Sequence, residues 1–178
     1  MFILKKVYIV LTYTGTILSQ IVRLYTKKDY SHVSLSLDKD LNQMYSFGRL
    51  FSYTPIFAGF VQESPKYGTF KRFKKTRSKI YSLEISDKDY KTVQETIEKF
   101  KKNRRKYGFN MLGLIAVMGH YHIKRRKHLY CAEFVKIVLE QTSLDLHLPE
   151  VIKPDDFQRI EGAKEVYTGL LRDYNSLS

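Results

Sequence analysis

The only thiol in this chain stands where a helix is expected to begin. Cys131 is the single cysteine of the sequence. The first turn of a helix carries unpaired backbone N–H groups and the positive end of the helix dipole. That setting favours the thiolate, which is the nucleophilic form of a thiol. The helix is predicted from apolar side chains at i, i+3, i+4, i+7 and i+8, which share one helical face: Cys131, Phe134, Val135, Val138 and Leu139.

The candidate base lies far upstream, at the start of a predicted strand. His32 opens a stretch in which polar and apolar side chains alternate, the period of a strand with one polar face. A histidine on such a face can serve a facing thiol as general base and then as general acid. The polar side chains of the alternation are His32, Ser34 and Ser36, and the apolar ones are Val33, Leu35 and Leu37.

The elements that must position these two side chains follow from periodicity and turn residues. A helix over 17–25 has Thr14 or Thr16 as its candidate N-cap, and a second helix starts after the cap at Ser86. The glycine-, proline- and aromatic-rich segment 47–68 favours an extended surface loop, in which Arg49 and Glu63 are either site residues or ordinary surface charge. The remaining expected elements are strands over 7–11, 32–37, 44–47, 80–85 and 166–171 and a buried helix over 110–118.

The order of these motifs resembles a known family. The strand motif Ser31-His32-Val33, followed by a helix that opens with Tyr130-Cys131-Ala132-Glu133-Phe134-Val135, is similar to the circularly permuted branch of the NlpC-type thiol hydrolases. In that branch the histidine precedes the cysteine, the reverse of the order in papain. The resemblance extends from Val7 to about Leu139. It implies an α+β, papain-like fold for a single domain over residues 1–178, with an antiparallel sheet packed against helices.

The resemblance also implies a reaction and a third site residue. Cys131 would be the nucleophile and His32 the general base and acid, in acyl transfer at an amide or ester bond through a thioester. The position of Ser46 matches the polar group that orients the histidine. Many relatives carry a carboxylate in that role, so Tyr45 or Glu63 are the alternatives. The substrate would be a peptide, a lipid or an acylated molecule, and no cofactor is expected.

Composition limits the other functions to consider. The 178 residues are 43% apolar and 14% aromatic, which argues against disorder. One cysteine cannot form an internal disulfide, and no secretion signal or membrane span is apparent, so a cytoplasmic location is expected. Histidines at 120, 122 and 128 raise the question of a metal site, but no acidic or thiol ligand stands at a recognisable spacing beside them, so no metal is expected.

Charge supports a competing hypothesis. The formal net charge of +13 favours anionic partners, and the basic residues gather in the runs 71–79, 101–106 and 124–128. Phe70, Phe73 and Tyr107 lie near them and could stack on bases. The alternative function is therefore a non-catalytic basic module that binds nucleic acid or an anionic membrane or polymer. The charge of the runs alone predicts weak, salt-sensitive binding to polyanions without sequence preference.

Overall fold

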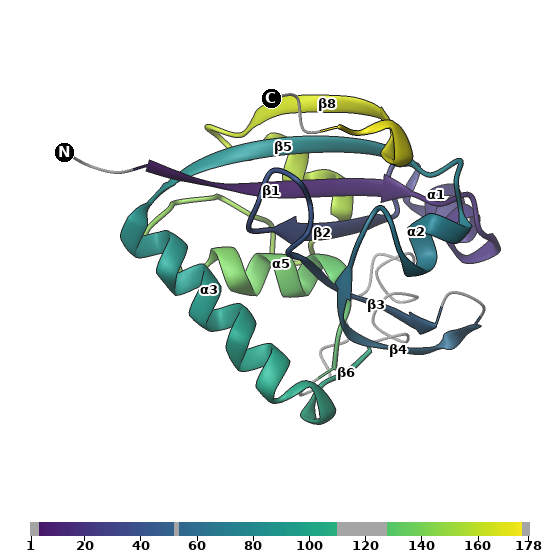
Figure 1. The fold of residues 1–178 in the computed structure, drawn as a ribbon, viewed down its shortest axis with the longest axis horizontal. Helices are drawn as coiled ribbons and strands as arrows, with labels where there is room; N and C mark the ends of the chain where they lie inside the picture. The colour runs from purple at the N-terminus through teal and green to yellow at the C-terminus, as the bar shows by residue number, and fades with distance from the viewer. Residues whose placement is uncertain (1–3, 52–53, 110–127, 176–178) are drawn as a thin grey trace.

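The chain forms an α+β fold whose centre is one six-stranded antiparallel sheet (Figure 1). A computed structural model describes residues 4–51, 54–109 and 128–175. The strand order is β4-β3-β2-β1-β5-β8, and β6 and β7 form a separate parallel pair. The strands are β1 (Leu4–Tyr13), β2 (His32–Ser36), β3 (Met44–Phe51), β4 (Thr54–Glu63), β5 (Arg77–Ser86), β6 (Gly108–Phe109), β7 (His128–Leu129) and β8 (Lys164–Leu170). The helices are α1 (Ile17–Thr26), α2 (Gly68–Arg72), α3 (Asp87–Lys102) and α5 (Cys131–Leu139), with 3-10 turns η1 (Arg104–Lys106), η2 (Pro154–Arg159) and η3 (Leu171–Asp173).

The main core lies between one face of the sheet and the helices α3 and α5 (Figure 1). β1 is central and pairs along its length with β5 and at its second half with β2. Its residues Val7, Ile9 and Leu11 are fully buried on this face, as are Phe134 and Val135 of α5. Full burial of such side chains stabilises a fold by roughly 1.5–3 kcal/mol each, so this layer fixes α5 against the sheet.

A buried carboxylate joins the start of α3 to the segment that follows α5. The Ser86 hydroxyl caps α3 by accepting from the Asp89 N–H at 3.0 Å, as the sequence predicts. The Asp89 carboxylate in turn accepts from the Ser143 N–H and hydroxyl, both at 2.8 Å. These bonds satisfy the charge of Asp89, which is almost fully buried, and hold the two helices in a fixed arrangement.

The prediction that residues 47–68 form an extended surface loop is wrong. The strands β3 and β4 pair as an antiparallel hairpin, with Phe47 opposite Phe60 and Gly48 opposite Gly59. Packing decides the outcome, because Phe47 and Phe60 are buried and contact each other edge to face, with ring centroids 6.0 Å apart. Pro55 is tolerated because β4 lies at the edge of the sheet.

Some expectations fall on residues that the structure leaves undescribed. The helix predicted over 110–118, the histidines at 120 and 122 and most of the basic run 124–128 lie outside the described residues. Among the helices within residues 4–51, 54–109 and 128–175, none combines the length and apolarity needed to cross a membrane.

Candidate active site

Cys131 is the first residue of α5, where the sequence places it. The preceding Tyr130 is extended and buried, and its hydroxyl donates to the Ile152 carbonyl at 2.9 Å. Its backbone N–H donates to the Glu133 carboxylate at 3.1 Å. These two bonds fix the residue before the thiol, so the helix begins at Cys131 and presents it on the first turn.

His32 is the first residue of β2 and lies beyond the paired residues of β2 and β3. It pairs with Thr12 of β1, whereas the β2–β3 ladder contains only the pairs Leu35–Tyr45 and Ser36–Met44. The alternation puts His32 on the face opposite the one that α5 covers. The ring of His32 and the thiol of Cys131 nevertheless line one common space.

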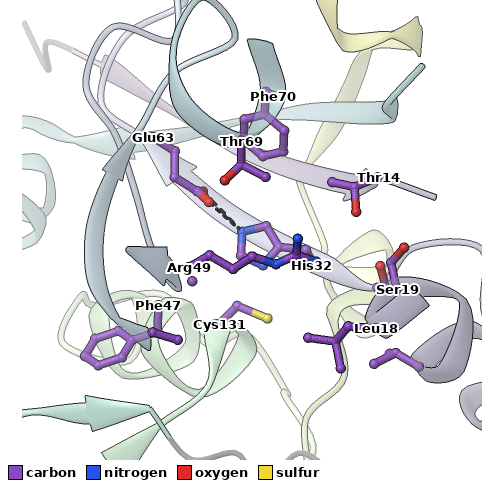
Figure 2. A pocket seen from close by; sticks show the side chains of 14 residues that line it. Thr14, Leu18, Ser19, His32, Phe47, Arg49, Glu63, Thr69, Phe70 and Cys131 are labelled. Atoms are coloured by element: carbon purple, nitrogen blue, oxygen red, sulfur yellow. Dashed lines mark hydrogen bonds and ion pairs between the residues drawn. The ribbon is translucent and has the colours of Figure 1, made fainter. Parts of the chain in front are cut away.

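That space is a pocket of about 80 Å³, shown in Figure 2. It opens between the start of α5, the start of β2, the β3–β4 hairpin and the helices α1 and α2. Thr14, Leu18, Ser19, Val22, Ser31, His32, Phe47, Gly48, Arg49, Ala58, Glu63, Thr69, Phe70 and Cys131 line it. The structure therefore brings together Cys131 and His32, the two residues that sequence analysis ranks first.

Glu63, the last residue of β4, holds the imidazole. His32 Nε2 lies 3.0 Å from Glu63 Oε1 and 3.1 Å from Oε2 (Figure 2). The Ser34 hydroxyl donates to Oε2 at 2.5 Å and so fixes the carboxylate itself. The His32 and Glu63 side chains are only 19% and 12% exposed, which shields their interaction from solvent. With Nε2 facing the carboxylate, Nδ1 is the ring nitrogen left for the thiol.

The charges around His32 favour its protonated form. Burial lowers the pKa of the imidazole, but the Glu63 carboxylate and the Cys131 side chain outweigh it and raise the pKa from 6.5 to about 10. Both partners act through charge and through hydrogen bonding to the ring. A histidine in this setting carries its proton at neutral pH and can support a neighbouring thiolate.

The structure does not place the Ser46 hydroxyl on the imidazole. Ser46 is fully buried and donates to the Val33 carbonyl at 2.7 Å, while Glu63 contacts the ring. Gly48 is the β3 residue beside the ring, since a Cβ on Gly48 would lie 3.4 Å from His32 Cε1 and 3.2 Å from Glu63 Oε1. The other alternative, Tyr45, stacks on Phe60 with centroids 5.9 Å apart.

On sequence grounds Glu63 is only an alternative to Ser46, because residues 47–68 are predicted to form a loop. In a hairpin, Glu63 lies opposite Met44 on β4, one strand beyond β3, and its side chain reaches His32 of β2. The signal that could have found it is the pair of buried aromatics at 47 and 60, which are spaced for a hairpin with Gly48 opposite Gly59.

Arg49 places a guanidinium in the wall of the pocket, in addition to the His32 imidazole. Its guanidinium donates to the Thr16 hydroxyl at 2.6 Å and lies 5.8 Å from the centroid of the Phe73 ring. Figure 2 shows the side chain reaching across the pocket toward Ser19 and Thr14. Burial lowers the pKa of this guanidinium, which indicates that it has lost part of its hydration.

The described basic runs, 71–79 and 101–106, do not line the pocket, and most of their cations are exposed. Lys71, Arg72, Lys74 and Lys75 are exposed around the end of α2, and the run 101–106 is exposed except at Asn103. Within the part of the chain that the structure describes, no three His, Cys, Asp or Glu side chains gather in a way that could hold a metal ion.

Comparison of the chain with protein-family models, with curated proteins and with solved structures finds no match. The fold and the pocket therefore carry the functional argument by themselves.

Proposed function

We propose that the protein is a cysteine hydrolase or acyltransferase that cleaves an amide or ester bond through a thioester on Cys131. The observation that carries this proposal is one pocket holding a thiol at a helix start and an imidazole fixed by a carboxylate. A cysteine that served packing alone would need no such histidine, and a structural ion pair would need no thiol beside it.

Each side chain has a separate role in the proposed acylation step. The Cys131 thiolate attacks the substrate carbonyl carbon, a C–S bond forms, and the carbonyl oxygen becomes an oxyanion. His32 gives its Nδ1 proton to the leaving nitrogen or oxygen as the C–N or C–O bond breaks, which leaves a thioester and a neutral imidazole. Glu63 keeps the ring oriented and stabilises its protonated form.

The deacylation step reverses the proton transfer. Neutral His32 takes a proton from water, or from an acceptor hydroxyl or amine, as that group attacks the thioester carbonyl. The C–S bond then breaks, and the thiolate–imidazolium pair is restored. Backbone N–H groups at the start of α5, including that of Cys131, are suited to stabilise the oxyanion in both steps.

The arrangement supports a papain-like fold of the permuted, NlpC-type kind. The histidine strand precedes the cysteine helix in the chain, and an antiparallel sheet backs that helix. The contact between Glu63 and His32 fits this proposal, because many members of that family orient the histidine with a carboxylate. A peptide, a lipid or another acylated molecule is the proposed substrate.

The rate at which Cys131 is alkylated by iodoacetamide near neutral pH tests the proposal. We expect the folded protein to react faster than its urea-unfolded form, because only the fold supplies the imidazolium partner. His32→Ala should remove this acceleration, and Cys131→Ala should remove the labelling. Slow labelling of the folded protein that His32→Ala leaves unchanged would show that Cys131 is a packing residue.

A further inference from the structure

Arg49 is a half-buried cation for which the described residues supply no anionic partner. Its hydrogen-bond acceptor is the neutral Thr16 hydroxyl, at 2.6 Å. Within residues 4–51, 54–109 and 128–175, no carboxylate forms an ion pair with it. A guanidinium has five N–H donors in a planar fork; the bond to Thr16 uses one of them, and Arg49 lines the pocket.

The carboxylate that shares the pocket does not neutralise this charge. Glu63 is bound by His32 Nε2 and by the Ser34 hydroxyl, and it serves the site as described above. A partly desolvated arginine without an anionic partner carries an energetic cost. An incoming anion would remove that cost, and a planar carboxylate matches the guanidinium fork in shape.

We propose that Arg49 binds a carboxylate group of the substrate and positions the scissile carbonyl beside Cys131. The inference rests on the proposed function and deepens it: the substrate is an amide or ester that carries a carboxylate close to the bond that is cleaved. The singly charged carboxylate fits better than a phosphate dianion, because the pocket already contains the Glu63 carboxylate, which repels the larger charge more strongly. The rest of the lining is largely apolar, with Leu18, Val22 and Phe70 available to the uncharged part of the substrate.

Two alkylating reagents of nearly equal size test this inference without a known substrate. Iodoacetate carries a carboxylate and iodoacetamide carries a neutral amide, and both react with Cys131, the only cysteine. The measurement is the ratio of their rate constants at fixed pH and ionic strength. The His32 imidazolium also attracts iodoacetate, so the comparison that matters is between variants in which His32 is retained.

Arg72 supplies a matched control, because it too stacks on Phe73, at 5.9 Å, but does not line the pocket. We expect Arg49→Met to lower the ratio of the iodoacetate rate to the iodoacetamide rate by roughly tenfold. Arg72→Met should leave the ratio unchanged, and Arg49→Lys, which keeps the charge but loses the fork, should retain an intermediate ratio.

The outcomes separate this inference from the proposed function. If Arg49→Met and Arg49→Lys keep the wild-type ratio of rate constants while iodoacetamide still reacts in a His32-dependent way, Arg49 does not bind the carboxylate. The proposed function is unaffected by that result. Equal slow reaction of both reagents in wild type and in His32→Ala overturns the proposed function instead. Circular dichroism and thermal unfolding of each variant establish that the altered rates come from the folded protein.

Discussion

His32 Nε2 lies within hydrogen-bond distance of both oxygens of Glu63, at 3.0 and 3.1 Å, although 31 residues separate them in sequence. The β3–β4 hairpin makes this contact possible, since it returns the chain to the sheet and ends at Glu63. The contact assigns Nε2 to the carboxylate and leaves Nδ1 for the thiol of Cys131. The proposed chemistry requires both contacts of the imidazole, Nε2 with Glu63 and Nδ1 with Cys131.

Replacing Glu63 should impair the thiol far more than replacing Ser46. Glu63→Gln removes the charge that stabilises the imidazolium, and we expect the His32-dependent part of the iodoacetamide rate to fall by about 10- to 100-fold. Ser46→Ala removes a buried hydrogen bond to the Val33 carbonyl. That variant should lose about 1–3 kcal/mol of stability and keep its thiol reactivity. If Glu63→Gln reacts as fast as wild type, a group other than Glu63 orients the His32 imidazole.

The raised pKa of His32 predicts how stability depends on pH. A group that binds its proton more tightly in the folded chain stabilises the fold fully below its unfolded pKa, and this contribution is lost as pH rises through the folded pKa. For His32 the window runs from 6.5 to about 10. Urea unfolding of wild type should therefore show stability falling across this window, and Glu63→Gln should flatten the fall. Parallel pH curves for the two proteins would contradict the assignment.

Titration of the ring itself gives an independent check on the same assignment. We expect the His32 imidazole signals in an NMR titration to move with a midpoint near 10 in wild type. The midpoint should be lower in Glu63→Gln, because the first charge that raises the pKa is gone. His32→Gln identifies the signals among those of the five histidines. A wild-type midpoint close to 6.5 would mean that the ring is solvated and unpaired in solution.

Gly48 is predicted to be needed for the spacing between His32 and Glu63. A Cβ at this position would lie 3.2 Å from Glu63 Oε1 and 3.4 Å from His32 Cε1, so Gly48→Ala must displace one of the two side chains. Because catalytic geometry is sensitive to displacements well below an ångström, thiol reactivity should fall by roughly tenfold. Gly59→Ala is the matched control: Gly59 is the register partner of Gly48, and a Cβ there meets no atom within 4 Å. If Gly48→Ala and Gly59→Ala react at the same rate, the close approach of Gly48 to His32 and Glu63 is not needed for thiol reactivity.

The exposed basic residues are predicted to bind polyanions weakly. Because binding driven by counterion release weakens with salt, affinity for duplex DNA should fall steeply as ionic strength rises and should not differ between unrelated sequences. Changing Lys71, Arg72, Lys74 and Lys75 to glutamine should reduce the salt dependence and leave Cys131 alkylation unchanged. Sequence-selective, salt-tolerant binding would instead favour the basic-module hypothesis over the enzyme.

The sequence predicts features that depend on neighbouring residues, such as helix starts and caps. It does not predict contacts that depend on how distant strands pair. The start of α5 at Cys131, the cap of α1 at Thr16 and the cap of α3 at Ser86 agree with the sequence predictions, because each depends on residues within one helical turn. The contact between His32 and Glu63 depends on strand register instead. Glycine and proline in 47–68 suggested a loop, and the buried pair Phe47 and Phe60 overrode them. The place of Arg49 in the pocket depends on contacts with Thr16 and Phe73, which no local pattern encodes.

The most direct test of the proposed function is whether Cys131 forms and then releases a thioester. The protein would be followed by intact-mass spectrometry during its reaction with p-nitrophenyl acetate. In wild type an acetyl group should appear quickly and then disappear as water attacks the thioester. In Cys131→Ala no acetyl group should appear. His32→Ala should acylate slowly and fail to release the group, since the same imidazole serves both steps. If wild type acylates no faster than its unfolded form, or if His32→Ala forms and releases the thioester at the wild-type rate, Cys131 and His32 do not act together as a catalytic pair.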